Sequence, residues 1–526
     1  GAAGQDGSAG TSPERKRGRT YSFGNRKNRA DPIFGDPSFR QVKSVSMMSP
    51  ALNAVIPVIC VALAGLTCML AEAFRERGER LPIGGLGMIG LVGAGISSVL
   101  LWGRRAESFG VVVADDFGLF VGLVLIVIGI LTIAFSSSLI ERDKLPQGEY
   151  YALVLFAISG MMLMAIATDL VIIFLALEVF SLSIYVLTGL RREALASTEA
   201  AFKYFLLGGF SSAFFLYGIA FTYGIVHSTR LDRIGAAMAA QSGGAVSPLV
   251  LVALGLLLVG FAFKVSAVPF HMWTPDAYEG APTIVTGFMS TAVKAAAFAA
   301  FARVFLSALE PLRAEWVPVV WVLAICTMIL GTVVGGAQTN VKRMLAYSSI
   351  AHGGYLLVAL VAGNSAGKAS ILFYLLVYAI TNLGAFAVIA LLGTRDKPVE
   401  QLDDYKGLWY SRPTASFILT VFLLSLGGFP PTAGFVAKWY VFTAAVGAGE
   451  YSLAIVGLLT SVVSVFFYLR VVVMMYMSGR VEGEAAPPLP RTAVAALVVS
   501  VAALFYLGLL PARLLDLAAS SISTIF

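Results

Sequence analysis

Cysteine, histidine and charged residues are scarce in this chain, and each shortage excludes a class of function. The three cysteines, Cys60, Cys68 and Cys326, lie in apolar runs without CxxC or Cys/His spacing, so neither a disulfide framework nor a metal cluster is supported. No phosphate-binding GKS or GKT loop and no haem-attachment sequence occurs. The chain therefore shows no means of its own for hydrolysis or redox chemistry, and we expect no cofactor within it.

A glycine motif near residue 85 could suggest a dinucleotide-binding site, but its context excludes one. Gly85, Gly87 and Gly90 satisfy GxGxxG, but no strand precedes them and the segment is a continuous apolar run. Close packing of helices explains these glycines, and a dinucleotide site does not.

Only 13% of the 526 residues are charged, whereas 58% are hydrophobic. Soluble domains contain roughly 25% charged residues, so a water-soluble globular protein is excluded. A helix needs about 20 apolar residues to cross a bilayer, and the runs are continuously apolar rather than alternating, which favours helices over a barrel. Fourteen such runs start near residues 50, 83, 116, 149, 169, 200, 248, 283, 317, 344, 367, 414, 450 and 490. We therefore predict an all-α polytopic membrane protein with about 14 transmembrane helices, in one domain of residues 48–526.

The first 47 residues differ from the rest, with nine Lys/Arg against four acids and many Gly, Ser and Pro. This composition predicts a disordered basic N-terminal tail over residues 1–47. A nucleic-acid-binding arm is conceivable, but a solvated tail is the commoner outcome, and we expect no nucleic-acid partner. In the short loops, the odd-numbered connections carry fifteen Lys/Arg and the others, with the C-terminus, carry seven. The positive-inside rule then places the odd-numbered loops in the cytoplasm.

Ionisable residues inside the apolar runs are the candidate functional residues, because a charge at mid-membrane costs at least about 2.5–3.5 kcal/mol. Glu178 lies in the middle of the fifth run and Lys203 near the start of the sixth. A carboxylate and an ammonium on successive antiparallel helices can face each other, so we expect these two to pair. The alternative interpretation is a structural ion pair, for which burial alone is weak support.

Two further runs combine a lysine with a helix break. Lys264 precedes Pro269, which removes a backbone donor and should break the seventh helix, and His271 follows with a side chain suited to proton exchange. Lys294 lies in the middle of the eighth run, far from either interface. In the twelfth run, GGFPP precedes Lys438. These lysines beside broken helices 7 and 12 indicate a proton relay, since burial disfavours an ammonium and a neighbouring carboxylate favours it.

Other polar residues have weaker claims. His352 in the tenth run is either a relay member or a hydrogen-bonded packing residue. We expect Lys342, Arg343 and Arg303 to be interface anchors.

An internal repeat is faintly visible at an offset near 168 residues. KYFLL from Lys203 resembles LFYLL from Leu372, and GFAF from Gly260 resembles GFPP from Gly428. Five helices separate each pair, and an odd number inverts the second copy. We therefore predict two inverted five-helix repeats, an arrangement that places ion sites at broken helices near mid-membrane.

Three long motifs resemble a known family. VPFHMWTPDAYEGAPTIVTGFMSTAVKAAAF, NVKRMLAYSSIAHGGY and LSLGGFPPTAGFVAKWY are similar to the antiporter-like membrane subunits of bacterial NADH-quinone oxidoreductase, complex I, and most of all to the subunit N type. The subunit M type resembles this chain but has glutamate where Lys438 stands. The subunit L type has histidine at the position of Lys294 and a lateral helix beyond the fourteenth span. The basic tail is not part of the family's usual pattern.

The resemblance implies a proton-translocating membrane-arm subunit in the bacterial cytoplasmic (plasma) membrane, with FMN, iron–sulfur clusters and quinone held by partner subunits. M-like and K-like membrane subunits would be its neighbours. The family positions fall on Glu178, Lys203, Lys264, Lys294 and Lys438, with His271 at the break. A subunit of an Mrp-type cation/proton antiporter is the alternative, and a purely structural scaffold is a third reading.

Overall fold

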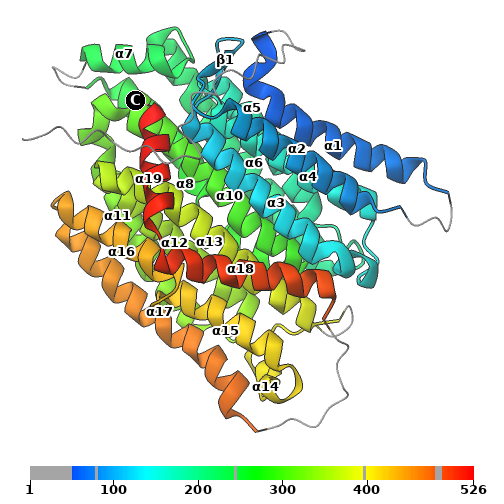
Figure 1. The fold of residues 1–526 in the computed structure, drawn as a ribbon. Coiled ribbons are helices and arrows are strands. Elements are labelled where there is room, and N and C mark those ends of the chain that lie inside the picture. The colour runs from blue at the N-terminus through cyan, green and yellow to red at the C-terminus, as the bar shows by residue number, and fades with distance from the viewer. Residues whose placement is uncertain (1–49, 77–80, 242–245, 395–397, 480–488, 526) are drawn as a thin grey trace, which may run out of the picture. The chain divides into compact units, whose positions relative to one another are not determined.

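The computed structural model describes residues 50–76, 81–241, 246–394, 398–479 and 489–525. The basic tail expected at residues 1–47 lies outside these described residues. Nearly all of the described chain is helical (Figure 1). The long helices are α1 Ile56–Ala73, α2 Ile83–Leu101, α3 Asp116–Arg142, α4 Gln147–Ile166, α5 Leu170–Thr188, α6 Leu195–Val226, α10 Thr283–Arg303, α11 Arg313–Ala337, α12 Val341–Ala362, α13 Ser365–Leu392, α17 Tyr451–Met477 and α18 Arg491–Leu509.

Shorter elements connect or interrupt these helices. They are α7 Leu231–Gln241, α8 Pro248–Lys264, α9 Trp273–Gly280, α14 Leu408–Ser411, α15 Pro413–Gly427, α16 Ala433–Gly447 and α19 Ala512–Ile522, with the hairpin of β1 Ala106–Ser108 and β2 Val112–Ala114. Short segments of 3-10 or π-helix are η2 Pro50–Val55, η3 Val304–Ala308, η4 Glu310–Leu312, η5 Leu402–Tyr405 and η6 Ser523–Ile525.

Helix boundaries follow local chemistry. Asp115, Asp169, Asn340 and Asn364 each accept a hydrogen bond from a backbone N–H in the first turn of α3, α5, α12 and α13, which satisfies groups that have no partner within the helix. At the other end, Gly428 terminates α15 with a φ of +86°, a conformation that favours glycine.

Twelve helices within the described residues have the length and apolar composition of a membrane span. The two remaining predicted spans, the seventh and twelfth, begin with the shorter apolar helices α8 and α15. Each is followed by a non-helical segment and then by a further helix, α9 and α16 respectively. The breaks predicted near Pro269 and Pro430 are therefore present, and the total of 14 crossings stays a prediction. The inverted repeat also stays a prediction.

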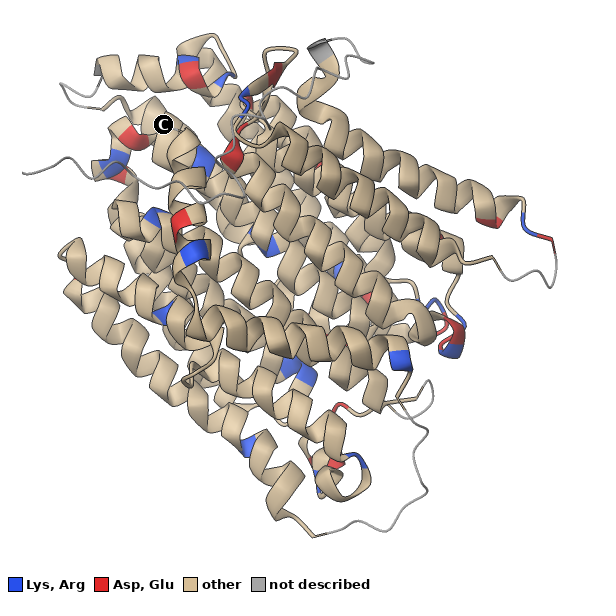
Figure 2. Ribbon diagram, viewed as in Figure 1, with Lys and Arg blue, Asp and Glu red and all other residues tan. Residues whose placement is uncertain are grey.

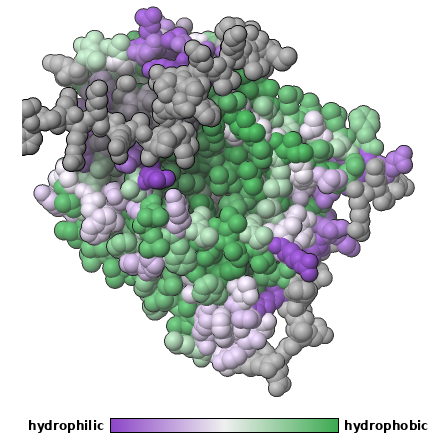
Figure 3. All heavy atoms as spheres, viewed as in Figure 1, coloured by the Kyte–Doolittle hydropathy of each residue, from purple (hydrophilic) through white to green (hydrophobic). Residues whose placement is uncertain are grey.

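Charge and hydropathy are distributed as a bilayer requires. Charged residues gather at the two ends of the bundle, with few between them (Figure 2), and the face seen in Figure 3 has a broad apolar band between polar ends. Apolar residues exposed on α5 include Leu175, Val179 and Leu182. Such a surface is stable against lipid or another membrane subunit, and not against water.

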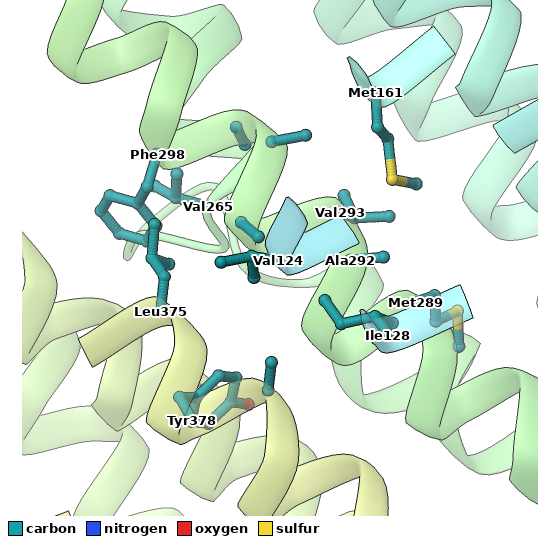
Figure 4. Close-up of a cluster of buried hydrophobic side chains, with 14 of the residues drawn as sticks. Val124, Ile128, Met161, Val265, Met289, Ala292, Val293, Phe298, Leu375 and Tyr378 are labelled. Carbon is teal, nitrogen blue, oxygen red and sulfur yellow. The ribbon is translucent and has the colours of Figure 1, made fainter. Parts of the chain in front are cut away.

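The core centres on α10, whose residues are all buried. Met289, Ala292 and Val293 of α10 pack with side chains of α3 and α4, and Phe298 lies near Leu375 of α13 (Figure 4). This dense apolar packing fixes α10 and so fixes the position of Lys294 on it.

Candidate functional site

The break after α8 holds the first buried lysine. Lys264 is 2% exposed, and its Nζ donates a hydrogen bond of 2.8 Å to Ser181 Oγ on α5. The rings of Phe180, Tyr185 and Tyr204 lie 5.3 to 5.8 Å from the same Nζ. Aromatic faces attract a cation without supplying a fixed countercharge. Lys264 is thus held in place without a bonded carboxylate.

Glu178 lies one turn from Ser181 on α5 and within electrostatic range of Lys264. Its Oε1 accepts a hydrogen bond of 2.5 Å from Ser212 Oγ on α6. Lys203, by contrast, forms ion pairs with Glu199 at 2.8 Å and Asp276 at 3.0 Å, and its side chain is 44% exposed. The predicted Glu178–Lys203 pair is therefore wrong. Lys203 lies near the N-terminal end of its long helix, where its side chain reaches the polar end of the bundle, whereas Glu178 is near the middle of α5.

His271 lies in the segment between α8 and α9, as predicted, and is partly buried. Its Nδ1 is buried without a hydrogen-bond partner among the described residues. The break itself is stabilised by side chains: Thr327 Oγ1 accepts from Val268 N at 2.9 Å, and Thr274 donates to Ser266 at 2.8 Å. These hydroxyls replace the hydrogen bonds that an unbroken helix would make.

Lys294 is 1% exposed and donates to the carbonyl oxygen of Ser349 on α12. Gly353, one turn further along α12, lies between the two lysine sites. A Cβ atom at Gly353 would be 3.0 Å from Val265 O, the carbonyl beside Lys264, and 3.6 Å from Lys294 Nζ. The absence of a side chain here leaves the first break and Lys294 close together.

His352 connects Lys294 to the second break. Its Nδ1 lies 2.6 Å from Tyr374 OH and its Nε2 lies 3.4 Å from Tyr468 OH, and it interacts electrostatically with both Lys294 and Lys438. Tyr468 also shares a short hydrogen bond with Ser348. The tyrosine bonds fix the orientation of the ring and fit the interpretation of His352 as a hydrogen-bonded packing residue, while its role as a relay member stays a prediction.

The second break holds Lys438, which is 5% exposed. Its Nζ donates to Ser461 Oγ at 2.8 Å and to Gly427 O, a carbonyl at the end of α15, at 3.1 Å. A Cβ at Gly428 would lie 3.1 Å from Lys438 Cδ, so glycine permits this approach. An open pocket of about 200 Å³ with a mostly apolar lining adjoins Lys438 between α16 and α17.

Sequence reasoning missed the buried ion pairs at the ends of the bundle. Arg303 is no interface anchor, since it forms two hydrogen bonds of 2.7 Å with Asp115 and is 3% exposed. Lys342 is also buried and pairs with Glu400 at 3.2 Å. Arg343 is only partly buried, and it lies 3.0 Å from Asp276 and 2.5 Å from Glu279, which are partly exposed as well. These partners are far apart in sequence, so spacing offered no signal for them.

Sequence reasoning also missed the hydroxyl partners of the lysines, Ser181, Ser461 and the tyrosines around His352. The sequence feature that could have indicated these residues is a hydroxyl side chain within an apolar helix. Such residues are common, so this feature alone is weak evidence. No described group of three or more His, Cys, Asp or Glu is arranged to hold a metal ion. What the site offers is a series of amines, hydroxyls and the imidazoles of His271 and His352, groups that can exchange protons.

Residues 167–464 match the family model described as NADH:quinone oxidoreductase/Mrp antiporter, transmembrane. The chain belongs to this family. It is 44% identical over 475 residues to NADH-quinone oxidoreductase subunit N of Trichlorobacter lovleyi, covering 90% of this chain and 97% of that protein. Among solved structures, a chain of respiratory complex I from Thermus thermophilus is 36% identical with a TM-score of 0.75, covering 88% of this chain and 100% of that one. A chain of the Mrp complex from Dietzia sp. DQ12-45-1b has the same TM-score at 20% identity, covering 90% of this chain and 97% of that one, and shows the fold alone.

These similarities confirm the resemblance to the subunit N type and the polytopic α-helical fold. The chain is a multi-pass membrane protein, and in bacteria the membrane concerned is the plasma membrane. The Mrp alternative is the weaker of the two, because subunit N relatives match at 41–44% identity over most of the chain.

Proposed function

We propose that this chain translocates protons in the membrane arm of NADH-quinone oxidoreductase along the line Lys264, Lys294, His352 and Lys438. Quinone reduction in other subunits perturbs the charge at Glu178. A change at Glu178 alters how strongly Lys264 holds its proton, because the two interact across the α5–α8 contact. Lys264 then releases its proton toward Lys294 through the space beside Gly353. From Lys294 the proton passes by way of His352, which is held by two tyrosines, to Lys438.

The observation that carries the proposal is the bonding of the three lysines. None of Lys264, Lys294 and Lys438 has a carboxylate within ion-pair distance among the described residues. Each donates instead to a hydroxyl or a carbonyl oxygen. A neutral amine can keep such bonds, whereas deprotonating a lysine in a buried salt bridge would leave an unpaired carboxylate. These lysines are therefore suited to change protonation state, and a structural role would favour ion pairs.

FMN, iron–sulfur clusters and quinone belong to partner subunits in this proposal, and the neighbours in the membrane are M-like and K-like chains. The partly exposed Glu178 on the apolar surface of α5 supports a covering membrane partner there, since a carboxylate facing lipid is costly. His271 and Lys203 take lesser roles, His271 at the hydrated break and Lys203 in the ion pairs at the polar end.

Purification of the native complex that contains this chain tests the assignment. We expect a peripheral arm with flavin and iron–sulfur absorbance to co-purify, and we expect proteoliposomes of the complex to acidify or alkalinise their lumen when NADH and quinone are supplied. A complex without flavin that exchanges Na⁺ for protons under an imposed gradient would establish the Mrp alternative.

The passage between Lys264 and Lys294 gives a specific prediction. Gly353→Ala places a methyl group 3.0 Å from Val265 O and 3.6 Å from Lys294 Nζ. We expect NADH-driven proton transport through this chain to fall about tenfold, because roughly one hydrogen bond's worth of transition-state stabilisation is lost in the path. The initial rate of dye-detected pH change in proteoliposomes measures it.

Gly336→Ala on α11 is the matched control, since a Cβ there has no neighbour within 4 Å. Alanine should slightly stabilise that helix by up to about 1 kcal/mol and leave transport unchanged. Equal transport by the two variants would show that protons do not pass beside Gly353.

A further inference from the structure

A row of buried polar side chains leads to Lys294 from the end of the bundle where α10 begins. Thr283, Thr286, Ser290 and Lys294 recur every three or four residues along α10, so they share one face of the helix. Asn382 of α13 bonds to this row at Ser290. Apart from Lys294 itself, the line proposed above uses none of these residues.

At its inner end the row is joined by hydrogen bonds. Asn382 Nδ2 donates to Ser290 Oγ at 2.8 Å and to Tyr378 OH at 3.0 Å. Tyr378 OH donates to Ser349 Oγ at 2.8 Å, and the backbone carbonyl of Ser349 accepts from Lys294. Asn382 is thus three contacts from the lysine amine.

The amide oxygen of Asn382 has no partner among the described residues, although the side chain is fully buried. Exchanging the amide's oxygen and nitrogen would not repair this. The Ser290 hydroxyl already donates to Gly287 O at 2.9 Å and the Tyr378 hydroxyl donates to Ser349, so both can only accept from Asn382. A buried acceptor left unbonded loses the hydrogen bonds that water gave it in the unfolded chain and destabilises the fold. The oxygen therefore points to a bound donor, and water is the donor small enough for this packed interior.

At the outer end, the row meets a buried ion pair. Lys342 Nζ bonds to Glu400 Oε1 at 3.2 Å and to Ala281 O at 2.6 Å, and Thr283 Oγ1 lies 3.5 Å from the same Glu400 oxygen. A cavity of about 20 Å³ adjoins Thr283 and Glu400 and is also lined by Arg191, whose Nε is buried without a partner among the described residues. The cavity can hold about one water.

Resting on the proposed function, we propose that Asn382 binds a structural water and that this water, with the Lys342–Glu400 pair, gives Lys294 a proton uptake route that does not pass through Lys264, although the charge on Lys264 still controls when Lys294 accepts a proton. Thr286 and Ser290 are one helical turn apart, about 6 Å along the axis, a gap that one further water spans. A proton arrives on the water beside Glu400. Each water and hydroxyl along the face of Thr283, Thr286 and Ser290 accepts it on oxygen and passes its own proton on, and the water bound to Asn382 Oδ1 gives the last proton to a neutral Lys294 amine. The Ser349 carbonyl carries no proton and only holds that amine in place.

The end of the bundle at which this route begins is rich in Lys/Arg, with Arg142, Arg191, Lys342 and Arg343 gathered there. The positive-inside rule makes this the cytoplasmic end. The route therefore takes protons from the cytoplasm, as a respiratory proton pump must do.

A density map of the native complex at a resolution that shows ordered waters is the direct test. We expect a water peak within hydrogen-bonding distance of Asn382 Oδ1 and a second beside Glu400. An apolar contact at Asn382 Oδ1, or well-resolved density with no peak there, overturns the proposal whether or not any variant folds.

Asn382→Leu supplies the functional test. We expect proton transport through this chain, measured per NADH oxidised, to fall about tenfold through the loss of one hydrogen-bonded step, and we expect Ser290→Ala to lower it in the same direction. The control is Ser370→Ala on the same helix as Asn382, which removes a buried hydroxyl that bonds within that helix, to Gly367 O at 2.8 Å. We expect the control to retain transport.

The outcomes separate this proposal from the function on which it rests. Normal transport by Asn382→Leu and Ser290→Ala, together with a block in Lys264→Met, overturns the separate route and leaves the main line intact. Normal transport by all of these variants overturns both.

Discussion

Replacing Lys264 with methionine is expected to stop proton transport through this chain while the complex still assembles. Methionine fills the volume of the lysine stem within the aromatic surroundings of Phe180, Tyr185 and Tyr204, so packing is retained. The amine that exchanges protons is lost, and a positioned acid or base contributes a factor of at least about 100 in rate. Proton movement per NADH oxidised, measured in proteoliposomes with a pH dye, gives the effect. If the partner subunits pump independently, the number of protons moved per NADH oxidised falls only by the share that this chain contributes.

Lys264→Arg distinguishes proton exchange from the mere presence of a charge. A guanidinium keeps its proton under all conditions in proteins, so we expect the arginine variant to be blocked as well. The matched control is Lys406→Met, which removes a half-exposed lysine paired with Asp403 at 2.9 Å. Full pumping by an intact complex carrying Lys264→Met would support the scaffold interpretation, and full pumping by Lys264→Arg would show that charge alone suffices.

The largest effect on stability is expected at Arg303. Its guanidinium forms two bonds with Asp115 and a third with Ala165 O at 3.1 Å, and both partners of the ion pair are buried. Arg303→Met leaves the Asp115 carboxylate buried and unpaired, which costs about 3–5 kcal/mol. We expect a marked fall in the thermal unfolding temperature of the complex, or in the amount of complex recovered from membranes.

Two further variants show whether the unpaired charge is the cause. Adding Asp115→Asn to Arg303→Met should restore part of the stability, because asparagine is neutral and can still accept from Gly118 N at the start of α3. Arg230→Met is the control, since its pair with Asp232 is exposed and worth about 0–1 kcal/mol. A loss at Arg303 no greater than at Arg230 would contradict the prediction.

Several features of the site could be predicted from single residues. Pro269 and the GGFPP segment placed the two helix breaks, because a missing backbone N–H and a glycine in the left-handed region each end a helix wherever they occur. Lys264, Lys294 and Lys438 could be singled out because an amine within an apolar run is costly in any packing arrangement. Each of these arguments depends only on neighbours along the chain.

Contacts between distant segments could not be predicted in this way. The assumed Glu178–Lys203 pair failed because the direction in which each side chain points depends on how α5 and α6 pack, and Lys203 instead reaches Asp276 in α9. Arg303 was expected at an interface, yet Asp115, 188 residues earlier, draws it into the interior.

By itself, the sequence determined that the chain is a helical membrane protein with amines buried at two helix breaks, because hydropathy and backbone chemistry act locally. Only the tertiary structure decided which groups each amine meets: Ser181, the Ser349 carbonyl and Ser461, with no carboxylate of the described residues at bonding distance. That choice is made by the packing of helices that lie far apart along the chain, and the proposed loss of a proton from each lysine depends on it.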